Sequence, residues 1–117
     1  MAAIIFNSDY GGNTVGRVDD NGTVFDNEYG GNAVGRVDSD GIVFNSEYGG
    51  NAIGRVDRSG SVFNSEYGGR IVGRVDNNGV IFDSDYGGNA IGRVELPAGS
   101  LWSLRLKAGA AYLLLFR

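Results

Sequence analysis

The chain has 117 residues, of which 42% are hydrophobic, the size of a single domain with a modest core. It contains no cysteine and no histidine, which excludes disulfides and thiolate chemistry and removes the commonest metal ligand and general base. The formal net charge is −4, and this acidic excess disfavours a nucleic acid as partner.

A 19-residue repeat occupies most of the chain and determines the predicted elements. Each unit contains Gly-Gly, three further residues, and then Gly-Arg-Val followed by Asp or Glu. A period of about 20 residues is typical of solenoids, propellers and related closed arrays. The tyrosine that precedes the motif recurs at the same interval, as Tyr10, Tyr29, Tyr48, Tyr67 and Tyr86.

The N-terminal residues run directly into repeat sequence. Residues 1–6 carry no basic segment of the kind that opens a secretory signal, so no signal peptide is expected in this sequence. We therefore expect a cytoplasmic protein, or one of unknown location if a signal peptide has been removed.

Each unit has the pattern of two strands joined by a glycine turn. In the second unit the strands are residues 23–29 and 32–38, and Gly30-Gly31 lies between them. A Gly-Gly pair between two such runs predicts a two-residue hairpin turn, because the central residues of that turn need positive φ. Successive units are joined by Asp-x-x-Gly segments, of which residues 38–41 are one.

The odd length of the repeat constrains the second connection. Side chains alternate faces along a strand, so two two-residue turns in each 19-residue unit would move equivalent residues to opposite faces in successive units. We therefore predict a three-residue loop at each Asp-x-x-Gly segment, with its glycine in the left-handed conformation. The resulting register pairs Arg36 with Phe25 and Phe44, and Val37 with Val24 and Val43.

Residues 96–117 depart from the repeat. Residues 102–107 alternate between apolar and polar side chains, as a strand does, and residues 110–116 are apolar on both faces. We expect a C-terminal β-hairpin that packs on a five-repeat β domain of residues 1–95, the two forming a single domain overall. This apolar segment is too short to cross a bilayer as a helix, and it is the expected surface for any self-association.

The predicted fold is therefore all-β, with five 19-residue β-hairpin repeats closed around a pseudo-five-fold axis and a C-terminal β-hairpin. A β-solenoid is the alternative. We favour the closed ring because a solenoid would stack the five repeat arginines in a ladder of like charges. A solenoid would also need distinct caps at both ends, and residues 1–3 offer none.

The repeat sequence resembles a known family. Units of the form Val-Phe-Asn-Ser-Glu-Tyr-Gly-Gly-Asn-Ala-Ile-Gly-Arg-Val-Asp, which extend over residues 4–95, resemble the bacterial five-fold beta-flower proteins. That family is named for petal-like β-hairpins around a pseudo-five-fold axis. The resemblance implies a closed all-β fold of unassigned biochemical role, and it carries over no catalytic residue.

The candidate binding residues are the aromatic and polar side chains around the Gly-Gly turn. A tyrosine ring flanked by Glu, Asn and Arg can stack on a sugar and bond its hydroxyls, and several equivalent weak sites would bind a glycan by avidity. In the alternative, tyrosine packs over the glycine turn, and Arg and Glu form ion pairs between neighbouring hairpins. The candidate residues are Tyr10, Tyr29, Tyr48, Tyr67, Tyr86, Glu28, Glu47, Glu66, Asn32, Asn51, Arg36 and Arg55.

No motif identifies a reaction. Each repeated acid has a basic neighbour, which disfavours the paired carboxylates of a glycosidase, and the Asp-x-x-Gly segments lack the full calcium loop. We predict a non-enzymatic binding or structural module with no metal and no cofactor. The alternative is a multivalent, lectin-like carbohydrate-binding protein with one shallow site per repeat. The partner is unknown, with a glycan or a second copy of the chain as candidates.

The repeat is least regular around its fourth unit. Arg70-Ile71 stands where the other units have Asn followed by Thr or Ala, and Arg58 enlarges the preceding turn. We expect this side of the ring to meet the C-terminal segment or a partner, with Ile71 in a contact role.

Overall fold

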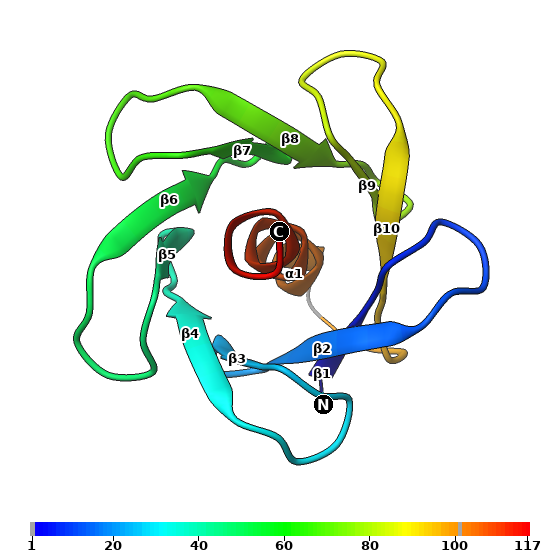
Figure 1. Ribbon diagram of the computed structural model, residues 1–117, viewed down its shortest axis with the longest axis horizontal. Coiled ribbons are helices and arrows are strands. Elements are labelled where there is room, and N and C mark those ends of the chain that lie inside the picture. The colour runs from blue at the N-terminus through cyan, green and yellow to red at the C-terminus, as the bar shows by residue number, and fades with distance from the viewer. Residues whose placement is uncertain (1, 101) are drawn as a thin grey trace.

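The computed structural model describes residues 2–100 and 102–117, with the side chain of residue 102 left out. The described residues form ten strands and one helix (Figure 1). The elements are β1 (Ala2–Phe6), β2 (Thr14–Asp19), β3 (Thr23–Phe25), β4 (Ala33–Val37), β5 (Ile42–Phe44), β6 (Ala52–Val56), β7 (Ser61–Phe63), β8 (Ile71–Val75), β9 (Val80–Phe82), β10 (Ala90–Glu95) and α1 (Trp102–Leu115).

The strands form one closed antiparallel barrel. Each strand pairs with its neighbours in sequence, and β1 pairs with β10 to close the ring, with Ile5 opposite Val94. The two longer dimensions of the molecule are equal, at 33 Å, and the third is 25 Å. The prediction of a closed, nearly all-β array is thus confirmed, and the solenoid alternative is wrong because its units would not return to the first strand.

The Asp-x-x-Gly turns have the predicted form. Arg36 lies opposite Phe44 and Val37 opposite Val43, which leaves residues 39–41 as the loop. The Asp38 amide donates to the Ile42 carbonyl at 2.9 Å, and Gly41 has a φ of 86°. A left-handed residue at the last loop position suits glycine, because it has no Cβ to clash with the backbone.

The Gly-Gly connections differ from the prediction. Strand β3 ends at Phe25, and residues 26–32 form a wide loop rather than a two-residue turn. Asp26 closes this loop, because its amide donates to the Asn32 carbonyl at 3.1 Å and its Oδ1 accepts from the Asn32 amide at 2.9 Å. Short Asn and Asp side chains compete in this way with strand pairing. The predicted pairings of Arg36 with Phe25 and of Val37 with Val24 are therefore wrong, since Arg36 lies opposite Thr23 and Val24 lies opposite Gly35.

The inner wall of the barrel is made of small and β-branched residues. Burial alternates along each strand, as in β4, where Gly35 and Val37 are buried and Arg36 between them is partly exposed. Val24, Val43 and Val62 are completely buried. The lumen is therefore lined with short apolar side chains, which leaves room for a further element.

That element is the helix α1, which runs through the centre of the barrel (Figure 1). The predicted C-terminal hairpin over residues 96–117 is thus wrong. A closed barrel offers no free strand edge inside, so a chain that enters it must satisfy its own backbone hydrogen bonds, and a helix does so. Residues 108–113 are all buried, as expected of a helix that is apolar on every side. This burial also takes much of the segment away from the surface on which we expected copies to associate.

The helix fits into the lumen because the repeat has glycine, which has no side chain, at the positions that face it. The Cβ of an alanine at position 73 would lie 2.8 Å from Cδ1 of Leu113 and 2.5 Å from the Phe82 carbonyl oxygen. Close approaches of the same kind recur at each unit, so five consecutive side chains each lie against one repeat glycine. The contacts are Tyr112 with Gly92, Leu113 with Gly73, Leu114 with Gly54, Leu115 with Gly35, and Phe116 with Gly16.

Candidate functional site

The wide loops that carry the candidate tyrosines are held by arginines from the neighbouring strand. Arg36 of β4 lies flat on the ring of Phe44, with its guanidinium carbon 4.0 Å from the ring centroid. Its Nη1 donates to the carbonyls of Ser46 at 3.0 Å and Gly49 at 2.7 Å. One half-buried side chain thus joins the strand, the aromatic ring and both sides of the loop, and charge-assisted bonds of this kind are among the stronger ones in proteins.

This arrangement, which we call the arginine clamp, recurs at every loop. Arg93 clamps the first loop across the closure of the barrel, with donation to the carbonyls of Ser8 at 3.0 Å and Gly11 at 2.6 Å. The guanidinium carbon lies 3.9–4.0 Å from the ring centroid in all pairs, which are Arg17 with Phe25, Arg36 with Phe44, Arg55 with Phe63, Arg74 with Phe82, and Arg93 with Phe6. The candidate site residues Arg36 and Arg55 thus hold the loop backbone.

The tyrosines project from these loops into solvent. Tyr48 is 81% exposed, and the exposure of all five tyrosines lies between 80% and 85%. The alternative in which tyrosine packs over the glycine turn is therefore wrong. The loops themselves extend outward from the barrel like petals (Figure 1). Large aromatic side chains usually bury most of their surface, so this degree of exposure, repeated on every loop, is unusual.

The other candidate residues flank the tyrosines. Glu28, Glu47 and Glu66 are half-buried, each directly before a tyrosine, and Asn32 and Asn51 are exposed after the glycines. Among the described residues, the ion pairs expected between Arg and Glu of neighbouring hairpins are not formed. Across residues 2–100 and 102–117, the ion pairs join Arg17 to Asp19 at 3.1 Å and Arg93 to Glu95 at 3.0 Å. Each of these pairs lies within one strand.

Sequence reasoning missed the residue that closes each loop. Asn45 Oδ1 accepts a hydrogen bond from the Asn51 amide at 3.0 Å, as Asp26 Oδ1 does from Asn32. The signal was present, because the position after the phenylalanine of each repeat unit is always Asn or Asp, the residues that bond to nearby backbone most readily. These positions are Asn7, Asp26, Asn45, Asn64 and Asp83.

Two further observations concern metals and membranes. No cluster of three acidic side chains suited to a metal ion occurs in the part of the chain that the structure describes. Within the same residues, no helix has the length and apolar character needed to cross a membrane, and α1 has 14 residues.

The chain matches no protein-family model, and comparisons with curated proteins and solved structures find no significant similarity. Its function is therefore inferred from the chemistry of its own loops and surfaces.

Proposed function

We propose that the protein is a non-enzymatic binding module whose five tyrosine loops, spaced around a pseudo-five-fold axis as in the beta-flower family that its repeats resemble, engage a repetitive ligand. The observation that carries this proposal is the 80–85% exposure of all five tyrosines on loops whose backbones are clamped. Tyrosines that served only the fold would be packed against the barrel.

The clamped loops favour binding for an entropic reason. Ordering a flexible loop at an interface reduces the affinity, whereas a loop that already holds its bound shape avoids most of that cost. Tyrosine adds a large, rigid contact surface with a hydroxyl at its tip, and immobilising it restricts few rotatable bonds. Each loop is therefore a small preformed contact that needs little rearrangement.

A glycan is the ligand class that fits this chemistry best. The face of a tyrosine ring can cover the apolar face of a sugar, and the nearby Glu47 and Asn51 carry acceptors and donors for its hydroxyls. One such contact is weak, but several contacts on a molecule 33 Å across would act together on a polymer or a glycan-covered surface.

The charge of the loops narrows the glycan class. Every loop tyrosine follows an acidic residue, namely Asp9, Glu28, Glu47, Glu66 or Asp85. Five acids beside the contact surface would repel sulfated or phosphorylated polymers and anionic lipids. The proposed ligand is therefore a neutral polysaccharide.

The experiment is a glycan array probed with the wild type and with a graded series of variants. Tyr48→Ala alone, then Tyr48→Ala with Tyr67→Ala, and then all five tyrosines changed to alanine should lower the apparent affinity in steps, because each step removes one contact. Tyr48→Phe is the matched control, since it keeps the ring and removes only the hydroxyl. Circular dichroism and urea unfolding check that each variant is folded.

Two results would overturn the proposal. Undiminished binding of a neutral glycan by the folded five-alanine variant would place the contact elsewhere. The second result is that the wild type binds no neutral polysaccharide, either on the array or as an insoluble polymer. This result would exclude neutral polysaccharides as the ligand.

A further inference from the structure

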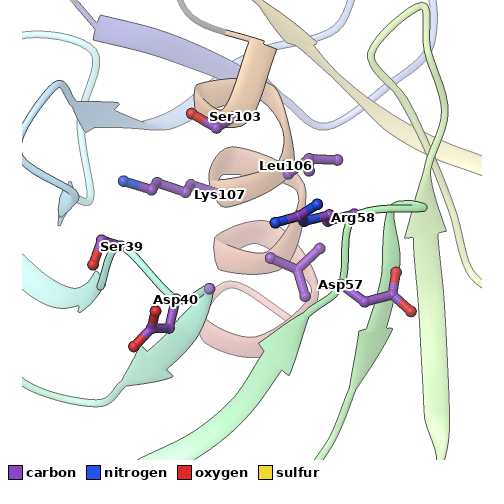
Figure 2. Close-up of a pocket in the computed structure, with 9 residues that line it drawn as sticks. Ser39, Asp40, Asp57, Arg58, Ser103, Leu106 and Lys107 are labelled. Carbon is purple, nitrogen blue, oxygen red and sulfur yellow. The ribbon is translucent and has the colours of Figure 1, made fainter.

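A pocket of about 480 Å³ lies beside the helix at the end of the barrel that carries the Asp-x-x-Gly turns (Figure 2). Three segments form it: the turn of residues 38–41, the segment 56–58 that begins the next turn, and residues 103–107 of α1. The tyrosine loops lie at the other ends of the strands. The pocket is therefore separate from the proposed glycan surface, and its volume is within the range of small-molecule sites.

Two cations from distant parts of the chain reach this pocket. Lys107 is the only lysine in the sequence, and Arg58 is the only basic residue within the four Asp-x-x-Gly segments. In Figure 2, Arg58 reaches from its turn toward the helix, and Lys107 extends from the helix toward the side of the pocket where Ser39 lies. Ser103 and Lys107 are four positions apart on the helix and so share one face.

The acids of the pocket do not neutralise these cations. Asp57 Oδ1 accepts hydrogen bonds from the Ser59 amide at 3.0 Å, the Ser59 hydroxyl at 2.6 Å and the Ser61 amide at 3.1 Å. Its carboxylate points away from the helix in Figure 2, and that of Asp40 points away from Lys107. Among the described residues, no ion pair joins Lys107 or Arg58 to either acid.

We propose that this pocket binds a small organic molecule that carries an oxyanion, a phosphate or a carboxylate, between Lys107 and Arg58. A lysine ammonium and an arginine fork are the usual partners of such groups. The hydroxyls of Ser39 and Ser103 supply further donors. The pocket also contains Val56 and Leu106, 7% and 6% exposed, so it contacts a carbon skeleton as well as the charged group.

The asymmetry of the helix makes this gap between the turns different from the equivalent gaps. The turns recur around the barrel, but α1 presents Ser103 and Lys107 to only one gap between them. The turn at that gap is the one that departs from its counterparts by carrying Arg58. The non-repeating helix and the turn that carries Arg58 therefore both line this pocket.

The test is a titration of the isotope-labelled protein, followed by the NMR shifts of its backbone amides. The probes are glycerol 3-phosphate, glycerate and glycerol, which share a three-carbon skeleton and differ in their charged group. Glycerol 3-phosphate should give saturable shifts confined to residues 38–41, 56–60 and 103–107. Glycerate should bind more weakly because it carries one charge, and glycerol should not bind. The anion that binds more tightly identifies the preferred oxyanion.

Arg58→Gln and Lys107→Gln should each weaken binding about tenfold, because each removes a hydrogen bond to a charged group. Arg70→Gln is the matched control, since it makes the same charge change on an exposed loop residue distant from the turns. The five-alanine tyrosine variant should bind as the wild type does, so failure here and failure of the glycan proposal are distinguishable. Absence of saturable shifts with both anions, or equal affinity of wild type and both glutamine variants, would overturn the proposal.

Discussion

The two ends of the barrel are built from the same repeat but differ in how closely their residues repeat. At the loop end, each loop is held by the same arginine clamp and the same Asn or Asp bond. At the turn end, the two residues between Asp and Gly differ in each turn, and are Asp20-Asn21, Ser39-Asp40, Arg58-Ser59 and Asn77-Asn78. The residues that make the same hydrogen bond in every unit keep the same type, Arg for the clamp and Asn or Asp for the loop closure, whereas the middle residues of the turns, which face solvent or the helix, vary.

The helix is the reason that the units cannot remain fully equivalent. An α-helix advances about 100° per residue, whereas units evenly spaced around a ring of five are separated by a fifth of a circle. Consecutive side chains of α1 therefore cannot meet successive units in identical ways. Leucine side chains such as Leu113 and Leu114 have several staggered rotamers and can therefore fill unequal spaces.

The largest expected effect tests whether the repeats fold without the helix. A chain that ends at Gly99 lacks α1, and its lumen would expose valines that are now completely buried, such as Val43. We expect no cooperative transition by circular dichroism during urea unfolding, because most of the shared apolar core is removed. Removal of Arg117 alone, an exposed residue, is the control. A sharp transition of the shortened chain would show that the barrel is stable by itself.

The second prediction concerns the glycines that admit the helix. Gly73→Ala should lower the free energy of unfolding by about 3 kcal/mol, because its Cβ meets both Leu113 and the Phe82 carbonyl. Adding Leu113→Ala should not restore the stability, since the backbone clash remains and a cavity is created.

Gly68→Ala is the matched control for this prediction. Its φ is 58° and no atom lies within 4 Å of the added Cβ, so only the backbone cost of about 1 kcal/mol applies. Equal losses at the two positions, measured by urea unfolding, would contradict the role assigned to the close contact.

The third prediction concerns the arginine clamp. Arg55→Met should cost about 2 kcal/mol, because the stacking on Phe63 and the bonds to the Ser65 and Gly68 carbonyls are lost together. The amides of residues 64–70 should exchange with solvent faster than those of the other loops. Arg70→Met, on the same loop but exposed, should leave both quantities unchanged. Unchanged exchange in Arg55→Met would mean that the loop holds its shape without the clamp.

The smallest expected effect is on the stability of the tyrosine variants. Tyr48 is 81% exposed, so Tyr48→Ala should change the free energy of unfolding by less than about 0.5 kcal/mol. Chemical unfolding of the purified variant measures this directly. A loss of several kcal/mol would mean that the ring packs against the barrel in solution, and the glycan proposal would lose its main support.

Periodicity and parity were sufficient to predict a closed, nearly all-β array and one of the two connections in each unit. The odd repeat length required a three-residue loop, and residues 39–41 form it. The same reasoning failed at Gly30-Gly31, because glycine suits several turn types and the bond from Asn32 to Asp26 selected the wide loop. The position of Arg36 opposite Phe44 was predictable from the register. The hydrogen bonds from Arg36 to the Ser46 and Gly49 carbonyls were not, because they depend on the wide loop that follows Phe44.

The tail could not be predicted from its own pattern. Residues 102–107 alternate as a strand does, and Leu104 and Leu106 are indeed both buried, but in a helix surrounded on all sides by the barrel. That environment is created by residues far away in sequence. The pocket was hidden for the same reason, since Arg58 and Lys107 line one pocket only after the barrel has closed around the helix. In the sequence, the signals that could have indicated the pocket are the unusual turn at Arg58 and the single lysine, Lys107.

Five successive side chains, Tyr112 to Phe116, each contact the glycine of a different repeat unit. The C-terminal segment is therefore matched to the number of repeat units. Repetitive genes gain and lose whole units by slippage, and an open array tolerates such changes. Here a sixth unit would leave one glycine without its side-chain contact, and a ring of four units would leave one of the five side chains without its glycine. Growth of this protein by duplication would therefore require a redesigned tail in the same step, which holds the number of units at five.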